Sequence, residues 1–362
     1  MFRTLALLSA TQPLSRPVPG EAAEAYLRQA GAATTARRAA WRRLSFLLSG
    51  QNRFRLDRFR TGVRRVLWIY FGELQLGDAL MDLAPRSLLA DSGLAVDLWT
   101  APAIASLFEG DPWLKRVGSE AADFLGTQYD CAVVLSNKRR PLAQKMLHFR
   151  SLQWVSLHES FTGPNFQRAA FSAVRLADLL GKRMSDAELA PHARQKLRPL
   201  QTAERNSSSA SKGAIALVVG GVRGDRSYGH WAKVIQVLTV AGYRRFVLLG
   251  SDNGVAEAGE LARHIPGQAQ VADLTGRLSL GQTRAVLDAS AVIACPDGGL
   301  MHLALTTRTP IVPLFSAQIA PVWRLPPDLV PFALQASTGG VQDIPPERVA
   351  QALLRSLSIS RR

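Results

Sequence analysis

The chain has 362 residues, of which 47% are hydrophobic and 20% are charged, so it is long enough for two domains with sizeable cores. No run approaches the ~18 apolar residues that a transmembrane helix needs. The two cysteines, Cys131 and Cys295, lie far apart inside apolar runs. This arrangement excludes the usual Cys/His spacing of a zinc site and predicts two reduced core thiols in a cytosolic protein.

The formal net charge of +16 is concentrated near the N-terminus. Residues 37–65 contain ten arginines and a single acid, Asp57, interleaved with aromatic and aliphatic side chains such as Trp41. A basic amphipathic segment of this kind suits an anionic membrane surface, although nucleic-acid binding or a solvated arginine-rich arm would give the same pattern. Because strand-like periodicity begins only at Val66, we treat residues 1–62 as an appended arm with one or two helices.

Residues 63–190 alternate between strand-like and helix-like patterns, which predicts a first Rossmann-like domain with a parallel sheet. The predicted strands are 66–71, 95–100, 131–136 and 154–157, and the predicted helices include 78–90, 139–149 and 166–180.

A polar stretch with a serine run, residues 191–213, is interpreted as an interdomain linker. A second alternation over residues 214–330 predicts a second Rossmann-like domain. Its predicted strands are 214–219, 246–249, 291–294 and 311–314, and its predicted helices are 230–241, 255–264 and 280–289. Residues 331–362 form a C-terminal tail with helical spacing, which we expect to pack across the first domain. Two parallel α/β sheets joined by one linker normally bind a ligand between the carboxyl ends of their strands, which predicts an enzyme with a central cleft.

The first chemical motif, GELQLGDALMDLAP at residues 72–85, follows a predicted strand and opens a helix. It places Asp78 at the helix start. A carboxylate there is either a helix cap or a general base directed at an acceptor hydroxyl. Asp82, one turn later, is interpreted as a solvated carboxylate.

The second motif, GGVRGDRSYGHW at residues 220–231, also follows a predicted strand. Arg223 and Arg226 are able to pair with phosphate oxygens, and the alternative is a flexible turn with solvated arginines.

The third motif, VIACPDGGLMHLA at residues 292–304, runs from a buried strand through two glycines into a helix. Asp297 is expected to cap that helix, while Gly298 and Gly299 leave room for a phosphate near free backbone amides. An ordinary strand-to-helix connection is the alternative. His302 is directed either at the ligand or into the core.

Taken together, these three motifs, the stretch LTGRLSLGQTRAVLDA at residues 274–289 and the segment TPIVPLF at residues 309–315 resemble glycosyltransferase family 9, the ADP-heptose:lipopolysaccharide heptosyltransferases and their relatives. The resemblance spans roughly residues 66–330. It implies a GT-B fold of two Rossmann-like domains whose parallel sheets face a central cleft. It also implies inverting transfer from a nucleotide sugar without an essential metal or cofactor, in agreement with the absence of a D-x-D pair.

The resemblance implies a role for each matching residue. Gly77 and Asp78 match the first family motif, with Asp78 as the base and Gly77 in the acceptor-side loop together with Arg223. The donor-binding residues implied by the resemblance are Arg226, Thr275, Gly276, Asp297, Gly298, Gly299 and His302. Gly298 departs from the family, because a Ser or Thr is usual at this position.

We therefore expect a cytoplasmic glycosyltransferase, peripheral on the inner face of the inner membrane, that moves heptose from ADP-heptose to a lipopolysaccharide-type or other glycan acceptor, free or lipid-linked. Residues 37–65 are expected to contact the anionic membrane, and no nucleic acid is expected as a partner. The alternative, suggested by Gly298, is a sugar-nucleotide-binding or scaffold protein with impaired catalysis.

Overall fold

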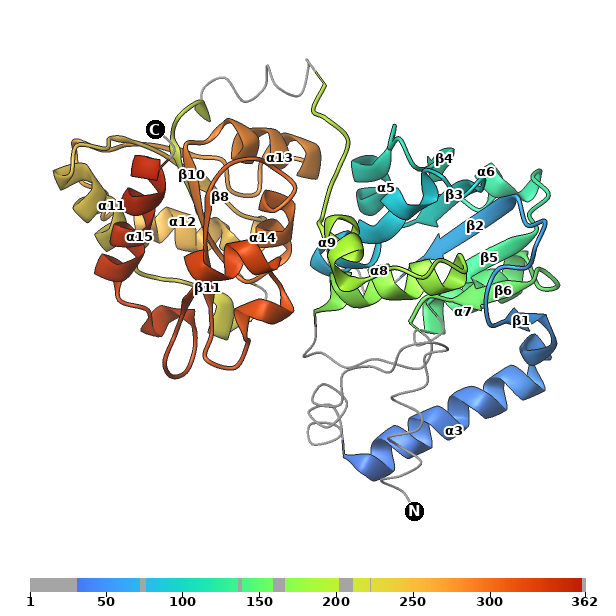
Figure 1. Cartoon of the computed structure of the whole chain (residues 1–362). Coiled ribbons are helices and arrows are strands. Elements are labelled where there is room, and N and C mark those ends of the chain that lie inside the picture. The colour runs from blue at the N-terminus through green and yellow to red at the C-terminus, as the bar shows by residue number, and fades with distance from the viewer. Residues whose placement is uncertain are drawn as a thin grey trace. The chain divides into compact units, whose positions relative to one another are not determined.

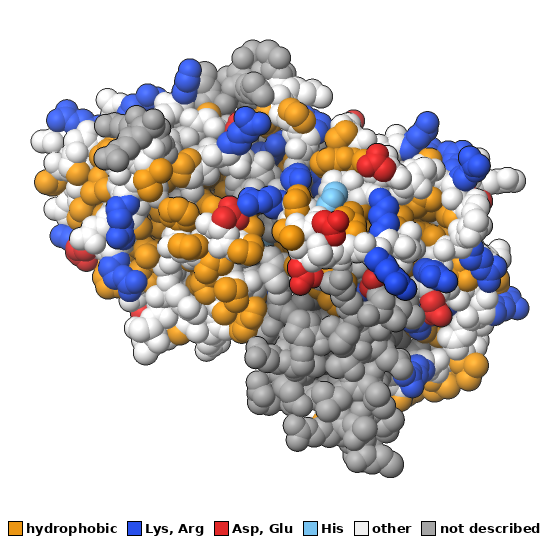
Figure 2. Space-filling view, in the orientation of Figure 1, with side chains coloured by type: hydrophobic (Ala, Val, Ile, Leu, Met, Phe, Trp, Pro, Cys, Tyr) orange, Lys and Arg blue, Asp and Glu red, His pale blue; other side chains and the backbone are white. Residues whose placement is uncertain are grey.

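The computed structural model describes residues 31–71, 76–135, 139–158, 167–201, 211–221 and 223–359. The chain divides into two compact units, Met1–Arg198 and Pro199–Arg362. Each unit contains one six-stranded sheet with helices packed against it (Figure 1). Lys and Arg side chains recur over the visible face of both units, as the net charge of +16 requires (Figure 2).

The first unit is built on a sheet of strand order β1-β6-β5-β2-β3-β4, in which all paired strands are parallel. The strands are β1 Arg55–Leu56, β2 Arg65–Tyr70, β3 Ala95–Thr100, β4 Arg116–Gly118, β5 Cys131–Val134 and β6 Trp154–Ser156. The four predicted strands are confirmed as β2, β3, β5 and β6. The sequence predicted neither edge strand, because two or three residues without an apolar run give no periodic signal.

The helices predicted for the first unit are found, with one exception. The helices of this unit are α3 Ala32–Leu48, α4 Leu76–Asp82, α5 Pro102–Phe108, α6 Ala122–Leu125, α7 Arg139–His148, α8 Arg168–Leu179 and α9 Asp186–Ala193. The single helix predicted over 78–90 is wrong: α4 ends at Asp82 and a 3-10 helix, Ala84–Leu89, follows. Pro85 explains the break, because proline has no N–H to continue the α-helical ladder.

The described part of the N-terminal arm is docked to the first sheet. Phe46 of α3 meets the Trp154 ring edge-to-face at 5.4 Å, and β1 pairs with β6. The buried Lys145 of α7 donates a hydrogen bond to the side-chain oxygen of Gln51 at 2.6 Å. The expectation of an arm without a strand is therefore wrong, and residues 46–56 belong to the folded unit. Residues 1–30 lie outside the described part of the chain.

The second unit repeats the architecture with strand order β12-β11-β10-β7-β8-β9, again with parallel pairs. Its strands are β7 Ile215–Val218, β8 Arg245–Leu249, β9 Gln270–Asp273, β10 Val292–Pro296, β11 Ile311–Phe315 and β12 Leu334–Gln335. Its helices are α11 Trp231–Val240, α12 Val255–Ala262, α13 Leu280–Ala289, α14 Gly299–Ala304 and α15 Pro346–Ile359. The predicted strands and helices of this unit are confirmed.

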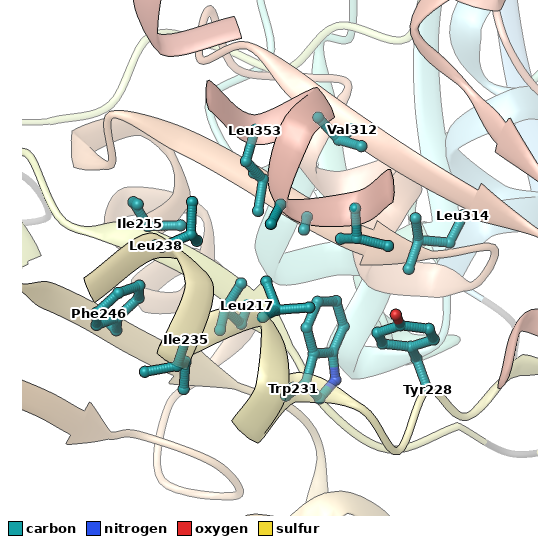
Figure 3. Packing of buried hydrophobic residues seen from close by; sticks show 14 of the residues in the cluster. Ile215, Leu217, Tyr228, Trp231, Ile235, Leu238, Phe246, Val312, Leu314 and Leu353 are labelled. Carbon is teal, nitrogen blue, oxygen red and sulfur yellow. The ribbon is translucent and has the colours of Figure 1, made fainter. Parts of the chain in front are cut away.

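The C-terminal helix α15 packs on the second unit, so the expectation that it crosses the first domain is wrong. Its buried face, including Leu353, joins one hydrophobic cluster with Trp231 of α11 and with Val312 and Leu314 of β11 (Figure 3). The hydroxyl of Tyr228 donates to the backbone oxygen of Ile344 at 3.0 Å and ties the loop before α11 to the segment before α15.

Both cysteines are free and buried, in agreement with their predicted role as core thiols. Burial raises the pKa of Cys131 to about 12. Among the described helices, none has the length and apolar content required to cross a membrane.

Candidate functional site

In the first unit, Asp78 lies in the first turn of α4, which follows the carboxyl end of β2 along the chain. Residues 72–75, the start of the predicted motif, lie outside the described part. The carboxylate of Asp78 is 17% exposed and lies 3.0 Å from Nη1 of Arg168. Gly77 is buried in the same turn. Asp78 is thus a partly exposed carboxylate paired with a cation, located inside the helix rather than at its cap.

Asp82 lies beneath Asp78 and is fully buried, so its interpretation as a solvated carboxylate is wrong. The Nε and Nη2 atoms of Arg168 donate to its two oxygens at 2.5 and 2.6 Å. The hydroxyl of Tyr70 donates to it at 3.0 Å, and Nε2 of His158 lies 3.4 Å away. Arg168 therefore bridges the buried carboxylate of Asp82 and the partly exposed carboxylate of Asp78.

The charges of this cluster stabilise one another. Burial by itself raises the pKa of Asp82, but the charges of Arg168 and His158 and the hydrogen bonds from Arg168 and Tyr70 outweigh it, so the pKa of Asp82 is lowered. Burial, and next the charge of Asp82, raise the pKa of Tyr70 well above its usual value. Asp82 thus remains a carboxylate that fixes Arg168. This cluster could not be predicted from the sequence, because Arg168 lies 86 residues away from Asp82 and belongs to no motif.

In the second unit, Asp297 follows the carboxyl end of β10 and is 3% exposed. Its Oδ2 atom lies 3.4 Å from Nη1 of Arg226, and its Oδ1 atom lies 3.9 Å from Nε of Arg324. The predicted capping role is wrong, because Gly298 is the N-cap residue of α14 and no side chain caps the helix. Two guanidinium groups hold the carboxylate instead. Arg324 belongs to no motif, and the sequence analysis did not identify it as a site residue.

The two arginines of the second motif differ in their surroundings. Arg226 ends a short 3-10 turn, Gly224–Arg226, and is directed at Asp297. The side chain of Arg223 is 61% exposed and pairs with Asp225 at 3.0 Å, as in the interpretation of a solvated turn. The structure therefore brings Arg226, and not Arg223, to Asp297.

Glycines bring the loops after β7 and β8 into backbone contact. Gly220 has a φ of +78°, and a Cβ atom there would lie 2.5 Å from the Cα atom of Gly254. Gly276, with a φ of +70°, donates its N–H to the backbone oxygen of Gly250 at 2.9 Å. Any side chain at Gly220 would force these loops apart. The neighbouring Thr275 is 3% exposed.

Four buried polar atoms near the carboxyl ends of the second sheet have no hydrogen-bond partner among the described residues. They are Nε of Arg226, Oγ1 of Thr275, Oδ2 of Asp297 and Oγ of Ser316. An unsatisfied buried polar group costs about 1–3 kcal/mol, so such groups are rare and normally explained. Three of them, Nε of Arg226 and the hydroxyls of Thr275 and Ser316, are donors at the ligand-binding edge of an α/β sheet, where acceptor oxygens of a ligand would satisfy them. Oδ2 of Asp297 already faces Nη1 of Arg226.

The remaining predicted positions lie around α14. His302 is 3% exposed, which favours its interpretation as a packed histidine. Gly298 has an extended backbone, and a Cβ atom placed on it would meet no atom closer than the backbone oxygen of Pro296 at 3.8 Å. Gly299 begins the helix. Across the described ranges, no group of three or more His, Cys, Asp or Glu residues is arranged to hold a metal ion.

Residues 150–327 match the family model of glycosyltransferase family 9 (heptosyltransferase). No curated protein sequence matches the chain.

Solved structures match over most of the chain. A glycosyltransferase family 9 structure from Veillonella parvula has a TM-score of 0.67 and 14% identity, and the match covers 82% of this chain and 97% of that one. E. coli ADP-heptose lps heptosyltransferase II has a TM-score of 0.61 at 17% identity, with coverage of 83% and 100%. E. coli heptosyltransferase WaaC with ADP has a TM-score of 0.61 at 17% identity, with coverage of 81% and 99%. The predicted α/β fold with two parallel sheets, of the GT-B type, is confirmed.

Proposed function

Because the chain carries a glycosyltransferase family 9 domain and is a glycosyltransferase, we propose that it moves heptose from ADP-heptose to a hydroxyl of a lipopolysaccharide-type acceptor. The proposal includes inversion at the anomeric carbon and independence from metals. Its main support is the set of unsatisfied hydrogen-bond donors at the carboxyl edge of the second sheet: Nε of Arg226, Oγ1 of Thr275 and Oγ of Ser316. Similar structures are described with ADP and with ADP-2-deoxy-2-fluoro heptose, ligands whose diphosphate oxygens would accept hydrogen bonds from such donors.

The second unit binds the donor in this proposal. Arg226 and Arg324 are cations beside a buried carboxylate, and the diphosphate oxygens would accept hydrogen bonds from them. Asp297 keeps the two guanidinium groups together before the donor arrives. Because α14 has only six residues, we assign stabilisation of the leaving diphosphate to the arginines rather than to a helix dipole.

Asp78 of the first unit is the general base. Its carboxylate takes the proton of the acceptor hydroxyl, the hydroxyl oxygen bonds to the anomeric carbon, and the bond from that carbon to the phosphate oxygen breaks. The nucleoside diphosphate leaves with the electron pair. Arg168 orients Asp78 through the ion pair at 3.0 Å.

A transfer assay with ADP-heptose and a lipid A–core acceptor tests the proposal. We expect Asp78→Asn to lower kcat by about 100-fold or more, whereas Asp91→Asn, which alters an exposed carboxylate of the same unit, keeps full activity. Wild-type turnover by Asp78→Asn would exclude the base assignment. Activity should persist in EDTA, and a loss that added metal restores would exclude metal independence.

A second candidate function rests on Gly298, which lacks the hydroxyl that the resemblance led us to expect. In that case the protein binds the sugar nucleotide without transferring the sugar. Calorimetry that detects ADP-heptose binding, together with no consumption of ADP-heptose with any acceptor, would favour this candidate.

We also propose that α3 lies on an anionic membrane surface, at the cytoplasmic face, where a lipid-linked acceptor would be presented. Phe46 anchors one side of α3 to Trp154. Most of the other side is apolar and open: Trp41 is 62% exposed, Leu44 41% and Leu48 77%. Exposed arginines at 37, 38 and 43 accompany this apolar face. An apolar stripe bordered by cations suits the interface of an anionic bilayer.

Sedimentation with phosphatidylglycerol vesicles tests this contact. Removing the whole arm would also remove Phe46 and β1, so point changes are sharper. We expect Trp41→Ala combined with Leu48→Glu to lower vesicle binding at least about tenfold. Val240→Glu, at an 87% exposed apolar position of α11, should not lower it. Equal binding to neutral vesicles, or salt-dependent binding to nucleic acid instead of vesicles, would contradict the proposal.

A further inference from the structure

Gly298 and Ser316 follow the ends of two paired strands, β10 and β11. The register of β10 and β11 places Pro296 opposite Leu314, and the N–H of Asp297 continues the ladder by donating to the oxygen of Leu314 at 2.8 Å. Continued by two residues, this register brings Gly298 opposite Ser316. Adjacent strands of a sheet lie about 4.8 Å apart, so side chains at these two positions would be close neighbours.

Both positions also continue the same face of the sheet. Ala294 of β10 and Val312 and Leu314 of β11 belong to the core cluster on that face. Side chains alternate between faces along a strand, and Gly298 is still extended, with φ 177° and ψ −174°. A side chain at Gly298 would therefore stand beside that of Ser316.

The hydroxyl of Ser316 is buried and unsatisfied. The residue is 1% exposed, and its Oγ atom has no hydrogen-bond partner in the part of the chain that the structure describes. The side-chain nitrogen of Gln335 donates to the backbone oxygen of Ser316 at 3.3 Å and holds the residue at the end of β11. A hydroxyl that is buried in this way without a partner costs free energy in the unliganded protein.

We infer that Ser316 supplies to the donor diphosphate the hydroxyl that is absent at Gly298. The inference rests on the proposed function. The Oγ–H group of Ser316 donates a hydrogen bond to a phosphate oxygen of the nucleoside diphosphate, at the same strand edge as Arg226 and Asp297. Because Ser316 supplies the hydroxyl in place of residue 298, the donor site is complete. A complete donor site argues against a protein that has lost its activity.

Calorimetric titration with ADP tests the inference on four variants of the whole chain. Ser316→Ala should weaken ADP binding by about tenfold or more, because a hydrogen bond to a charged group is lost. Ser316→Ala combined with Gly298→Ser should recover most of that loss, since position 298 is extended and has open space for a Cβ atom. Ser316→Thr keeps a hydroxyl and should retain most of the affinity. Ser356→Ala removes a buried hydroxyl that donates to the oxygen of Ala352, and it should bind ADP as the wild type does.

A second measurement separates a binding role from a structural one. Without ligand, Ser316→Ala should raise the melting temperature by about 2 °C, because an unsatisfied hydroxyl is removed, while the same variant binds ADP more weakly. If Ser316→Ala does not fold, Ser316→Cys is tested in its place, because a thiol is a weaker hydrogen-bond donor than a hydroxyl. If Ser316→Ala binds ADP with the affinity of the wild type, the inference about Ser316 is overturned, but the proposed function is not. Failure of the wild type to bind ADP or any other nucleoside diphosphate would instead overturn the proposed function.

Discussion

The guanidinium of Arg168 lies 3.0 Å from the carboxylate of Asp78 while its other nitrogens hold the buried Asp82. The orientation of the candidate base therefore depends on a carboxylate that has no access to solvent. Asp82 acts through Arg168 and is a positioning residue rather than a catalytic one.

Asp82→Asn should lower kcat by up to about 100-fold, because a small displacement of a catalytic group has a large effect on the rate. The KM for the nucleotide sugar should change little, since Arg226 and Asp297 belong to the other unit. Steady-state kinetics with both substrates measure this difference. An unchanged kcat in a folded Asp82→Asn protein would show that Arg168 does not need its buried partner.

Acid should destabilise the first unit through the same carboxylate. The pKa of Asp82 in the folded protein lies below its ordinary value of 3.8, so its contribution to stability is present above about pH 4 and is lost as the pH falls through the folded value. Urea unfolding at pH 7, 5 and 3.5 should give a free energy of unfolding that falls more steeply for the wild type than for Asp82→Asn. Equal slopes would contradict the lowered pKa.

Raising the pH should stabilise the folded protein through Lys145. Burial lowers the pKa of Lys145 to about 8, from an ordinary value of 10.5. Between these two values the unfolded state binds more protons than the folded state, so stability rises with pH across this window. Compared with Lys145→Met, the wild type should gain stability from pH 8 to pH 10, as measured by urea unfolding. A parallel response of the two proteins would exclude a lowered pKa.

The C-terminal helix should stabilise the second unit. Leu353 is fully buried against α11 and β11, so Leu353→Ala should cost about 3 kcal/mol. Ile359→Ala, at a 63% exposed position of the same helix, should change the free energy of unfolding by less than about 0.5 kcal/mol. Hydrogen exchange of peptides from α11 and α15 should quicken together in Leu353→Ala. Faster exchange confined to α15 would show that the helix does not support the unit.

The success of the sequence predictions followed the length of the elements. Central strands such as β2 and β10 are continuous apolar runs, because both faces of a parallel sheet are covered, and such runs are visible in the sequence. Short edge strands such as β1 carry no comparable pattern. The destination of α15 was also hidden, since an amphipathic helix shows that one face is buried but not which surface covers it.

The candidate site was predicted in part. Asp78, Arg226 and Asp297 stand out because each follows a strand at the edge where parallel sheets bind ligands. Three further residues belong to no motif: Arg168, Arg324 and Ser316. The fold brings Arg168 to Asp78, Arg324 to Asp297 and Ser316 to the same strand edge as Asp297.

By itself, the sequence determined the two α/β units, the order of most of their elements and the loops that carry the candidate chemistry, because local periodicity records burial along each segment. Tertiary structure decided which charges are paired. Asp297 faces two arginines instead of a helix end, Asp82 is buried under Asp78, and the hydroxyl of Ser316 is buried without a partner among the described residues. Such contacts join residues distant in sequence, and their energies depend on burial and distance, which only the packed chain defines.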